Sequence, residues 1–210
     1  MKRVLLALLI VAGLTAPGAR AGLDIDFGAA VRIGDDNDLF LSVSARYFDE
    51  DRRSVDRIAV RYSNPDDLTV ALFLARRSGK SADVVHRMRT DGLSWWDISL
   101  RLGMPVEVWF VPVSRSPGPP YGKAYGHWKN HKRNKHHAVV LTDVDIRNLV
   151  AVRMLHEYYG VSVEAAMEWR SSGRNLRVLV SDEYGKRHGH KQAKAAKGNK
   201  GNKGRGKSKH

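Results

Sequence analysis

The chain has 210 residues, 36 Lys and Arg against 22 Asp and Glu, and no cysteine. The absence of cysteine excludes a disulfide framework, thiol chemistry and lipid attachment to a cysteine side chain. The formal net charge of +14 favours anionic partners, and the uneven placement of the charge indicates which segments would contact them.

The N-terminal segment has the three-part layout of a secretory signal. Lys2 and Arg3 give a positive start, residues 4–14 are apolar or glycine, and alanines flank Arg20 just before residue 22. The apolar run is about half of the roughly 20 residues that a membrane-spanning helix needs. We therefore expect residues 1–21 to be a signal peptide that is cleaved near Ala21, and the mature protein to be periplasmic or secreted.

Two stretches after this signal alternate apolar and polar residues with the period of a β-strand. The odd positions are apolar from Leu23 to Ile33 and again from Leu39 to Tyr47, and the polar sequence GDDND lies between the two runs. Two alternating runs joined by a short polar loop are typical of a β-hairpin. The sequence thus predicts a β-hairpin region over residues 22–63 and an α+β fold, in which the hairpin packs on a mainly helical body.

A first helical unit is predicted over residues 64–113. Asn64, followed by a proline, is a good N-cap, and Ser81 is a candidate N-cap for a second helix. Ser94 and Asp97 have the spacing of a capping box, which predicts the start of a third helix.

A shift of 81 residues aligns this unit with a second helical unit at 143–185. The matches concentrate at expected caps and helix ends, which predicts an internal duplication of a helical hairpin. The matched pairs are Leu68 and Leu149, Gly79 and Gly160, Ser81 and Ser162, Asp83 and Glu164, Arg89 and Arg170, and Gly92 and Gly173.

The segment 114–142 between the two units is rich in proline, glycine, histidine and basic residues, and it is predicted to be a linker or a functional loop. Aromatic rings beside cations suit a surface that stacks on a ligand and neutralises phosphates, but they also suit a soluble linker with a few anchoring rings. The candidate polyanion-binding residues here are Tyr121, Lys123, Tyr125, Trp128, Lys129, Lys132, Arg133 and Lys135.

The C-terminal segment 186–210 contains ten Lys and Arg and no acidic residue. So few of its residues are apolar that we expect it to be disordered. Its composition resembles that of the basic arms of nucleic-acid-compacting proteins. The candidate polyanion-binding residues in it are Lys191, Lys194, Lys197, Lys200, Lys203, Arg205, Lys207 and Lys209.

The stretch GLSWWDISLRLGM, from Gly92 to Met104, resembles the central helix and turn of a helix-turn-helix. The resemblance implies a DNA-binding or nucleoid-associated protein as an alternative function. A recognition helix with polar side chains would have to follow Gly103. The sequence MPVEVWFVPV that follows consists mostly of packing residues, which argues against sequence-specific reading of DNA.

Four histidines suggest a second alternative, a periplasmic metal-binding protein. His127 and His131 are four residues apart, and His136 and His137 are adjacent, so their spacing suits ligation of zinc, nickel or copper. Four cationic side chains lie between His127 and His137, and they oppose a divalent cation. No catalytic motif is present, so we expect no enzymatic activity and no cofactor.

The charge distribution favours a polyanion as the partner. The signal, the linker and the C-terminal segment hold 19 of the 36 Lys and Arg, and the remaining residues hold 17 together with all 22 acids. We therefore expect an exported, non-enzymatic envelope protein whose basic loop and tail bind an anionic polymer or an anionic membrane surface. Lipopolysaccharide, anionic lipid, cell-wall polymer and extracellular DNA are the candidate ligands.

Overall fold

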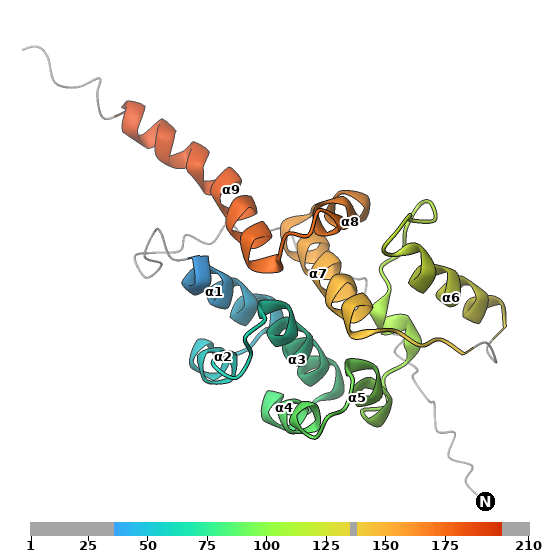
Figure 1. Cartoon of the computed structure of the whole chain (residues 1–210). Coiled ribbons are helices and arrows are strands. Elements are labelled where there is room, and N and C mark those ends of the chain that lie inside the picture. The colour runs from blue at the N-terminus through green and yellow to red at the C-terminus, as the bar shows by residue number, and fades with distance from the viewer. Residues whose placement is uncertain (1–35, 135–137, 199–210) are drawn as a thin grey trace, which may run out of the picture.

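The computed structural model describes residues 36–134 and 138–198. Over these residues the chain forms nine α-helices and one short 3-10 helix, with no β-strand (Figure 1). The elements are α1 (Asp36–Phe48), α2 (Arg52–Ala59), α3 (Pro65–Ser78), α4 (Ala82–Thr90), α5 (Trp95–Arg101), η1 (Val106–Trp109), α6 (Gly122–Arg133), α7 (Asp143–Tyr159), α8 (Val163–Ser171) and α9 (Leu176–Gly198).

The predicted β-hairpin and the α+β fold are wrong for the described residues. The first predicted strand, 23–33, lies outside these residues, while the second is the middle of α1. Helix α1 buries consecutive residues, including Leu39, Phe40 and Leu41, so it is covered on most of its circumference. A helix buried in this way shows no clear 3.6-residue period, and its short alternation imitates a strand.

Helix α2 is fixed at its start by Asp51, whose side chain accepts a hydrogen bond from the backbone N–H of Ser54. Arg52 then ties α2 to α1, because its guanidinium binds Asp38 at 2.8 Å and Ser42 at 2.6 Å. Val55 and Ile58 are buried, and the opposite face of this helix carries exposed arginines.

Helices α3 and α7 lie side by side in the centre of the molecule (Figure 1). Asp67 near the start of α3 pairs with Arg147 of α7, and six residues further along each helix Arg153 lies over the ring of Phe73. The equal register of these two contacts shows that the helices run in the same direction. The predicted cap at Asn64 is confirmed, because its side chain accepts a hydrogen bond from the N–H of Asp66.

The helices that follow α3 and α7 start at positions 81 residues apart. Helices α4 and α8 begin at residues 82 and 163, and α5 and α9 begin at 95 and 176. Ser81 and Ser162 cap α4 and α8 with their side chains, as the sequence predicts. The two units therefore share the order and the boundaries of their helices, apart from the longer α7 and α9.

The two units also exchange equivalent contacts. Arg89 at the end of α4 donates to the carbonyl of Leu93 at 2.8 Å and pairs with Asp143, the first residue of α7. The backbone N–H of Trp95, which begins α5, binds the same carboxylate at 2.8 Å. The first unit thus holds the N-terminus of the second unit's first helix.

The reverse contact uses Arg170, which matches Arg89, but its carboxylate partner is not at the position that matches Asp143. Arg170 donates to the carbonyl of Arg174 at 2.7 Å and pairs with Asp66 in the first turn of α3. The N–H of Leu176, which begins α9, binds the same carboxylate at 3.2 Å. Each unit therefore contacts the start of the other unit's first helix, and the two units pack around one shared core.

Two segments predicted to lack helix are helical. Helix α6 begins at Gly122, shortly after the last proline of the linker, and α9 continues as far as Gly198. Helix α9 starts in the core and packs against α1 and α3, so the costly first turns are stabilised by the body. The following lysines, alanines and glutamine have favourable helix propensity and extend it.

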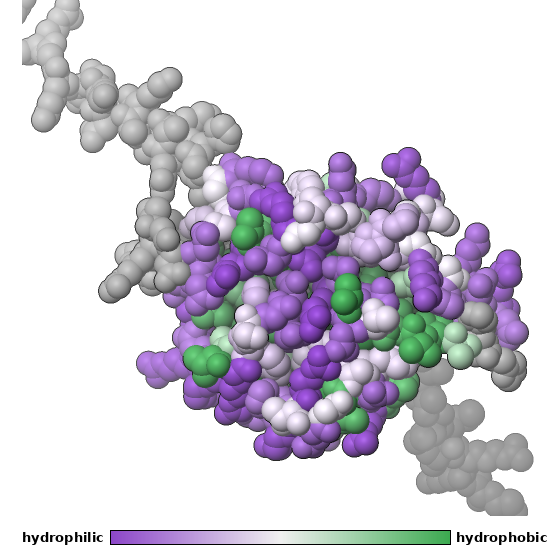
Figure 2. Space-filling model, viewed as in Figure 1, coloured by the Kyte–Doolittle hydropathy of each residue, from purple (hydrophilic) through white to green (hydrophobic). Residues whose placement is uncertain are grey.

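The core is continuous and contains large side chains such as Trp95, Trp109 and Phe40. No helix among the described residues is long and apolar enough to cross a membrane. On the face shown in Figure 2, apolar residues form small separate patches within a mainly hydrophilic surface.

Candidate polyanion-binding surface

Helix α6 is held to the body by aromatic packing. The ring of Trp128 stacks on Phe110 with a centroid distance of 4.7 Å, and Tyr125 meets both rings edge-on. The hydroxyl of Tyr125 donates to the carbonyl of Val111 at 2.8 Å. These contacts place the predicted aromatic residues against the protein itself.

Burial changes the role that the aromatic residues of α6 can play. Tyr121 is 3% exposed and Tyr125 is 5% exposed, so neither ring offers a face on which a ligand could stack. Trp128 is half-buried, and its ring already contacts Phe110 on one side and the Lys132 ammonium at 4.8 Å. The rings fix the orientation of α6, and the cations are left as the groups that a partner can reach.

The outward face of α6 is basic. Lys123, Lys129, Lys132 and Arg133 are all exposed, and none forms an ion pair with an acid in the part of the chain that the structure describes. No Asp or Glu occurs between residues 108 and 142. Residues 129, 132 and 133 are three and four positions apart, so their like charges repel one another along the helix. An anion bound there relieves this repulsion.

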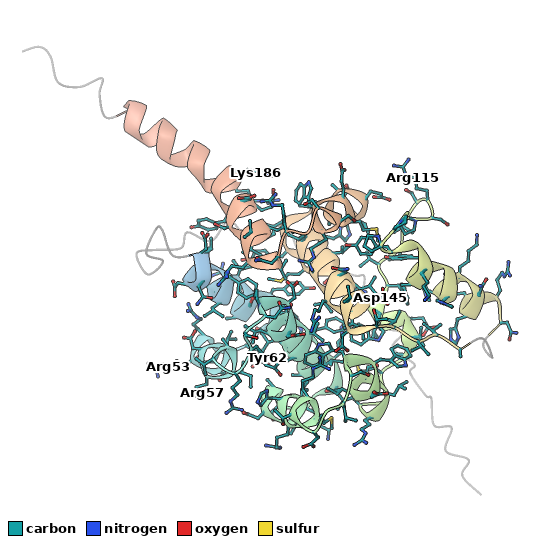
Figure 3. All side chains as sticks on the ribbon, in the orientation of Figure 1. Arg53, Arg57, Tyr62, Arg115, Asp145 and Lys186 are labelled. Atoms are coloured by element: carbon teal, nitrogen blue, oxygen red, sulfur yellow. The ribbon has the colours of Figure 1, made fainter. Side chains whose placement is uncertain are left out.

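The start of α6 leaves no room for a side chain at its first residue. A Cβ at Gly122 would lie 2.9 Å from the carbonyl oxygen of Pro117. The loop that precedes α6 therefore folds closely over the helix start. Figure 3 labels Arg115 at the outer edge of this loop, where it adds a further exposed cation beside α6.

The acid-free run of basic residues in α9 begins where this helix leaves the body, at the position labelled Lys186 in Figure 3. Lys186 pairs with Glu183 at 2.6 Å and lies over the ring of Trp169, and Arg187 lies over the ring of Tyr159. Glu183 is the last acidic residue of the chain. From residue 184 onward, α9 therefore adds only positive or neutral residues.

The remaining candidates divide between α9 and residues outside the description. Lys191, Lys194 and Lys197 belong to the projecting part of α9. The other candidates lie outside the described residues, and they are Lys135, Lys200, Lys203, Arg205, Lys207 and Lys209.

The metal candidates do not assemble into a site within residues 36–134 and 138–198. His127 and His131 lie one turn apart on α6, and His136 and His137 are outside the description. No group of three or more His, Asp or Glu residues in the described part of the chain is arranged to hold a metal ion. Structural zinc sites in proteins use four ligands, of which α6 supplies two.

The helix-turn-helix resemblance does not lead to a recognition helix. After α5 the chain forms η1, a single turn that ends at the buried Trp109. The start of α5 itself is buried, with Trp95 fully enclosed and Trp96 8% exposed. Within the described residues, α5 is therefore not followed directly by a helix that could read bases.

A cleft of about 690 Å³ lies between the loop before α6 and helix α8, and no sequence pattern indicates it. Glu164 and Glu168 line it on α8, opposite Arg115 and Ser116. Backbone N–H groups, together with the Ser114 hydroxyl at 2.9 Å, lower the pKa of Glu164, which keeps that carboxylate charged. Two carboxylates make this cleft a poor place for a polyanion, so the basic surface is the outward side of α6.

No family model, curated protein or solved structure matches this chain.

Proposed function

We propose that this protein binds an anionic polymer or anionic membrane surface by charge, without catalysis, through α6 and the basic C-terminal part of the chain. The observation that carries the proposal is the exposed, acid-free set of four cations on α6. Several arginines elsewhere on the body are paired with carboxylates, as in Arg147 with Asp67 and Arg170 with Asp66. The cations of α6 have no such partner among the described residues, so an external anion does not have to displace a carboxylate of that part of the chain.

The chemistry of the cations fits loose binding better than sequence reading. Three of the four charged residues on α6 are lysines, as are eight of the ten in the C-terminal segment. Lysine is a strongly hydrated point charge on a flexible stem, whereas arginine favours fixed, bidentate pairs. Contacts of this kind release counterions from the polyanion and are sensitive to salt.

Export is part of this proposal. Residues 1–21, which have the layout of a signal peptide, lie outside the described residues. Fractionation of cells and mass spectrometry of the N-terminal peptide will show a periplasmic or secreted protein that starts near residue 22. A chain that keeps Met1 in the cytoplasm contradicts the export proposal and limits the partner to intracellular polyanions.

The binding test uses a fluorescent DNA duplex, a lipopolysaccharide preparation and anionic vesicles at salt concentrations between about 50 and 200 mM. A variant with Lys123, Lys129, Lys132 and Arg133 all changed to Gln should flatten the slope of log affinity against log salt for the duplex by about 3 to 4. Deletion of residues 185–210 removes ten Lys and Arg and should weaken binding about 100-fold or more at about 150 mM salt.

The matched control neutralises two exposed arginines on α2, Arg53→Gln with Arg57→Gln. Figure 3 shows both residues on the side of the molecule away from α6. This variant should keep the affinity of the unmodified protein within about twofold. Equal losses in the α6 and α2 variants, or affinity that does not change with salt, would falsify charge-based binding at α6.

A further inference from the structure

We infer that α6 and the projecting part of α9 bind two different polymer chains, so that one molecule of this protein bridges phosphodiester polymers such as double-stranded nucleic acid. This inference rests on the proposed function, and it adds the geometry and the class of the partner. It follows from where the two basic segments lie on the body.

The two basic segments emerge on opposite sides of the molecule (Figure 1). Helix α6 is anchored through Phe110 and Trp128, while the first half of α9 packs against α1 and α3. The central helices α3 and α7 lie between them. Residues 188–198 extend α9 beyond its contacts with the body by about 17 Å, at about 1.5 Å per residue.

The body between the two segments is unfavourable for a single polyanion that reaches both. Within residues 36–113 and 143–185, 19 Asp and Glu outnumber 16 Lys and Arg. A duplex is also stiff over about 150 base pairs, so it resists bending around a body of this size. Two separate duplexes, one at each basic segment, avoid both the net negative charge of the body and the bending.

The exposed residues favour a polymer in solution over a lipid bilayer. Helices that settle into a bilayer surface present aromatic or aliphatic side chains to the acyl boundary. The aromatic side chains of α6 face Phe110 and Val111 of the body, and its outward residues are cationic or polar. Residues 185–210 contain alanine as their only hydrophobic residue type. Neither segment offers an apolar anchor, so both suit the phosphates of a hydrated polymer.

The test is a capture assay with the full-length mature protein. A biotinylated duplex of about 40 base pairs is fixed on beads, a fluorescent duplex of the same length is added, and the fluorescence retained on the beads is measured at about 50 mM salt. Binding of each duplex alone is measured by fluorescence anisotropy, and the mass of the protein by light scattering. Circular dichroism confirms that each variant keeps its helix content.

The unmodified protein should retain the fluorescent duplex at least about 10-fold above a protein-free control. The variant with the four α6 cations changed to Gln, and the variant that lacks residues 185–210, should each still bind a duplex but lose capture to near background. The α2 variant with Arg53→Gln and Arg57→Gln should capture normally. This pattern is expected only if one molecule needs both basic segments to hold two duplexes together.

Four results overturn the inference in distinguishable ways. Binding without capture by the unmodified protein rejects bridging and leaves the proposed function in place. Capture that survives loss of either segment, including capture through a dimer seen by light scattering, also rejects it. Clustering of anionic vesicles without capture of duplexes replaces the polymer with a bilayer as the partner. No binding to duplex, lipopolysaccharide or vesicle rejects the proposed function itself.

Discussion

Arg170 and Asp66 form a buried ion pair between residues 104 positions apart in the chain. The guanidinium Nη2 lies 2.7 Å from the carboxylate Oδ2, and both side chains are 8% exposed. Asp66 also accepts the N–H of Leu176, and Arg170 also donates to Asn148 and to the carbonyl of Arg174. The pair therefore joins α3, α7, α8 and the start of α9 at one point.

Asp66→Asn should lower the free energy of unfolding by about 3 kcal/mol, because it leaves the Arg170 charge buried without a counter-charge. The matched variant is Asp143→Asn, which breaks the equivalent pair with Arg89. That pair is about a quarter exposed, and water can solvate the arginine left behind, so the loss should be about 1 kcal/mol. Urea denaturation followed by circular dichroism measures both values. Equal losses in the free energy of unfolding would show that the burial of an ion pair does not determine how much the pair stabilises the fold.

A pair of glycine substitutions should change stability in opposite directions. Gly160 ends α7 with φ of 64°, a left-handed conformation in which a Cβ is strained, so Gly160→Ala should cost about 1 kcal/mol. Gly126 lies inside α6, and a Cβ added there would meet nothing within 4 Å, so Gly126→Ala should stabilise by up to about 1 kcal/mol. Thermal melting followed by circular dichroism separates the two signs, and a stabilising Gly160→Ala contradicts the assigned conformation.

The caps and helix ends were predictable from sequence because they depend on local chemistry. Ser94 and Asp97 form the predicted capping box, and Asn64, Ser81 and Ser162 cap as expected. Each of these hydrogen bonds joins residues two or three positions apart, so the required groups are visible in a short stretch of sequence.

Burial explains why α1 and α6 were predicted wrongly from the sequence. Helix α1 looked like a strand because its odd positions from Leu39 to Tyr47 are apolar, but Phe40 and Ser44 at even positions are as deeply buried as those neighbours. Helix α6 contains two glycines and was expected to be a loop, and it is helical where Tyr125 and Trp128 pack on the body. Partners such as Phe110 lie far from these residues in sequence, so tertiary contacts overrode the local signals.

The candidate site was predictable in its charge but not in its geometry. The cations of α6 and their lack of acidic neighbours are visible in the sequence. The inward orientation of Tyr121 and Tyr125, and the cleft beside Glu164, depend on how the loop folds against α8. Sequence composition therefore suggests the chemical class of the partner, while the structure limits which residues can touch it.

Stability should fall as the pH rises above about 10. Burial raises the pKa of Tyr62 and of Tyr125 to about 12, while in the unfolded chain both phenols ionise near pH 10. Between pH 10 and 12 the unfolded state loses these protons and the folded state keeps them, so unfolding becomes more favourable. The stability that the neutral phenols contribute is fully present below about pH 10. Urea denaturation at about pH 8, 10 and 11 measures the decline.

Tyr125→Phe tests whether ionisation of the buried tyrosines causes the loss of stability at alkaline pH. It removes the bond to the Val111 carbonyl and one ionisable group, so it should start less stable near neutral pH and decline less steeply in alkali. Ultraviolet absorbance of the phenolate provides an independent check, because the folded protein should show fewer ionised tyrosines at about pH 11 than the unfolded protein. Identical titration curves for the two states would contradict burial of these phenols.

Trp128 should matter more for the attachment of α6 than the cation that covers it. Trp128→Ala removes the stack on Phe110 and the edge contact with Tyr125, and should lower the free energy of unfolding by about 2 kcal/mol. Trp128→Phe keeps an aromatic ring at the same place and should cost less than half of that. Lys132→Gln removes only a cation 4.8 Å from the ring centroid at an exposed site, so its effect should stay within about 0.5 kcal/mol. Urea denaturation of the three variants ranks them, and a larger loss for Lys132→Gln than for Trp128→Ala would mean that charge, rather than ring packing, holds α6 to the body.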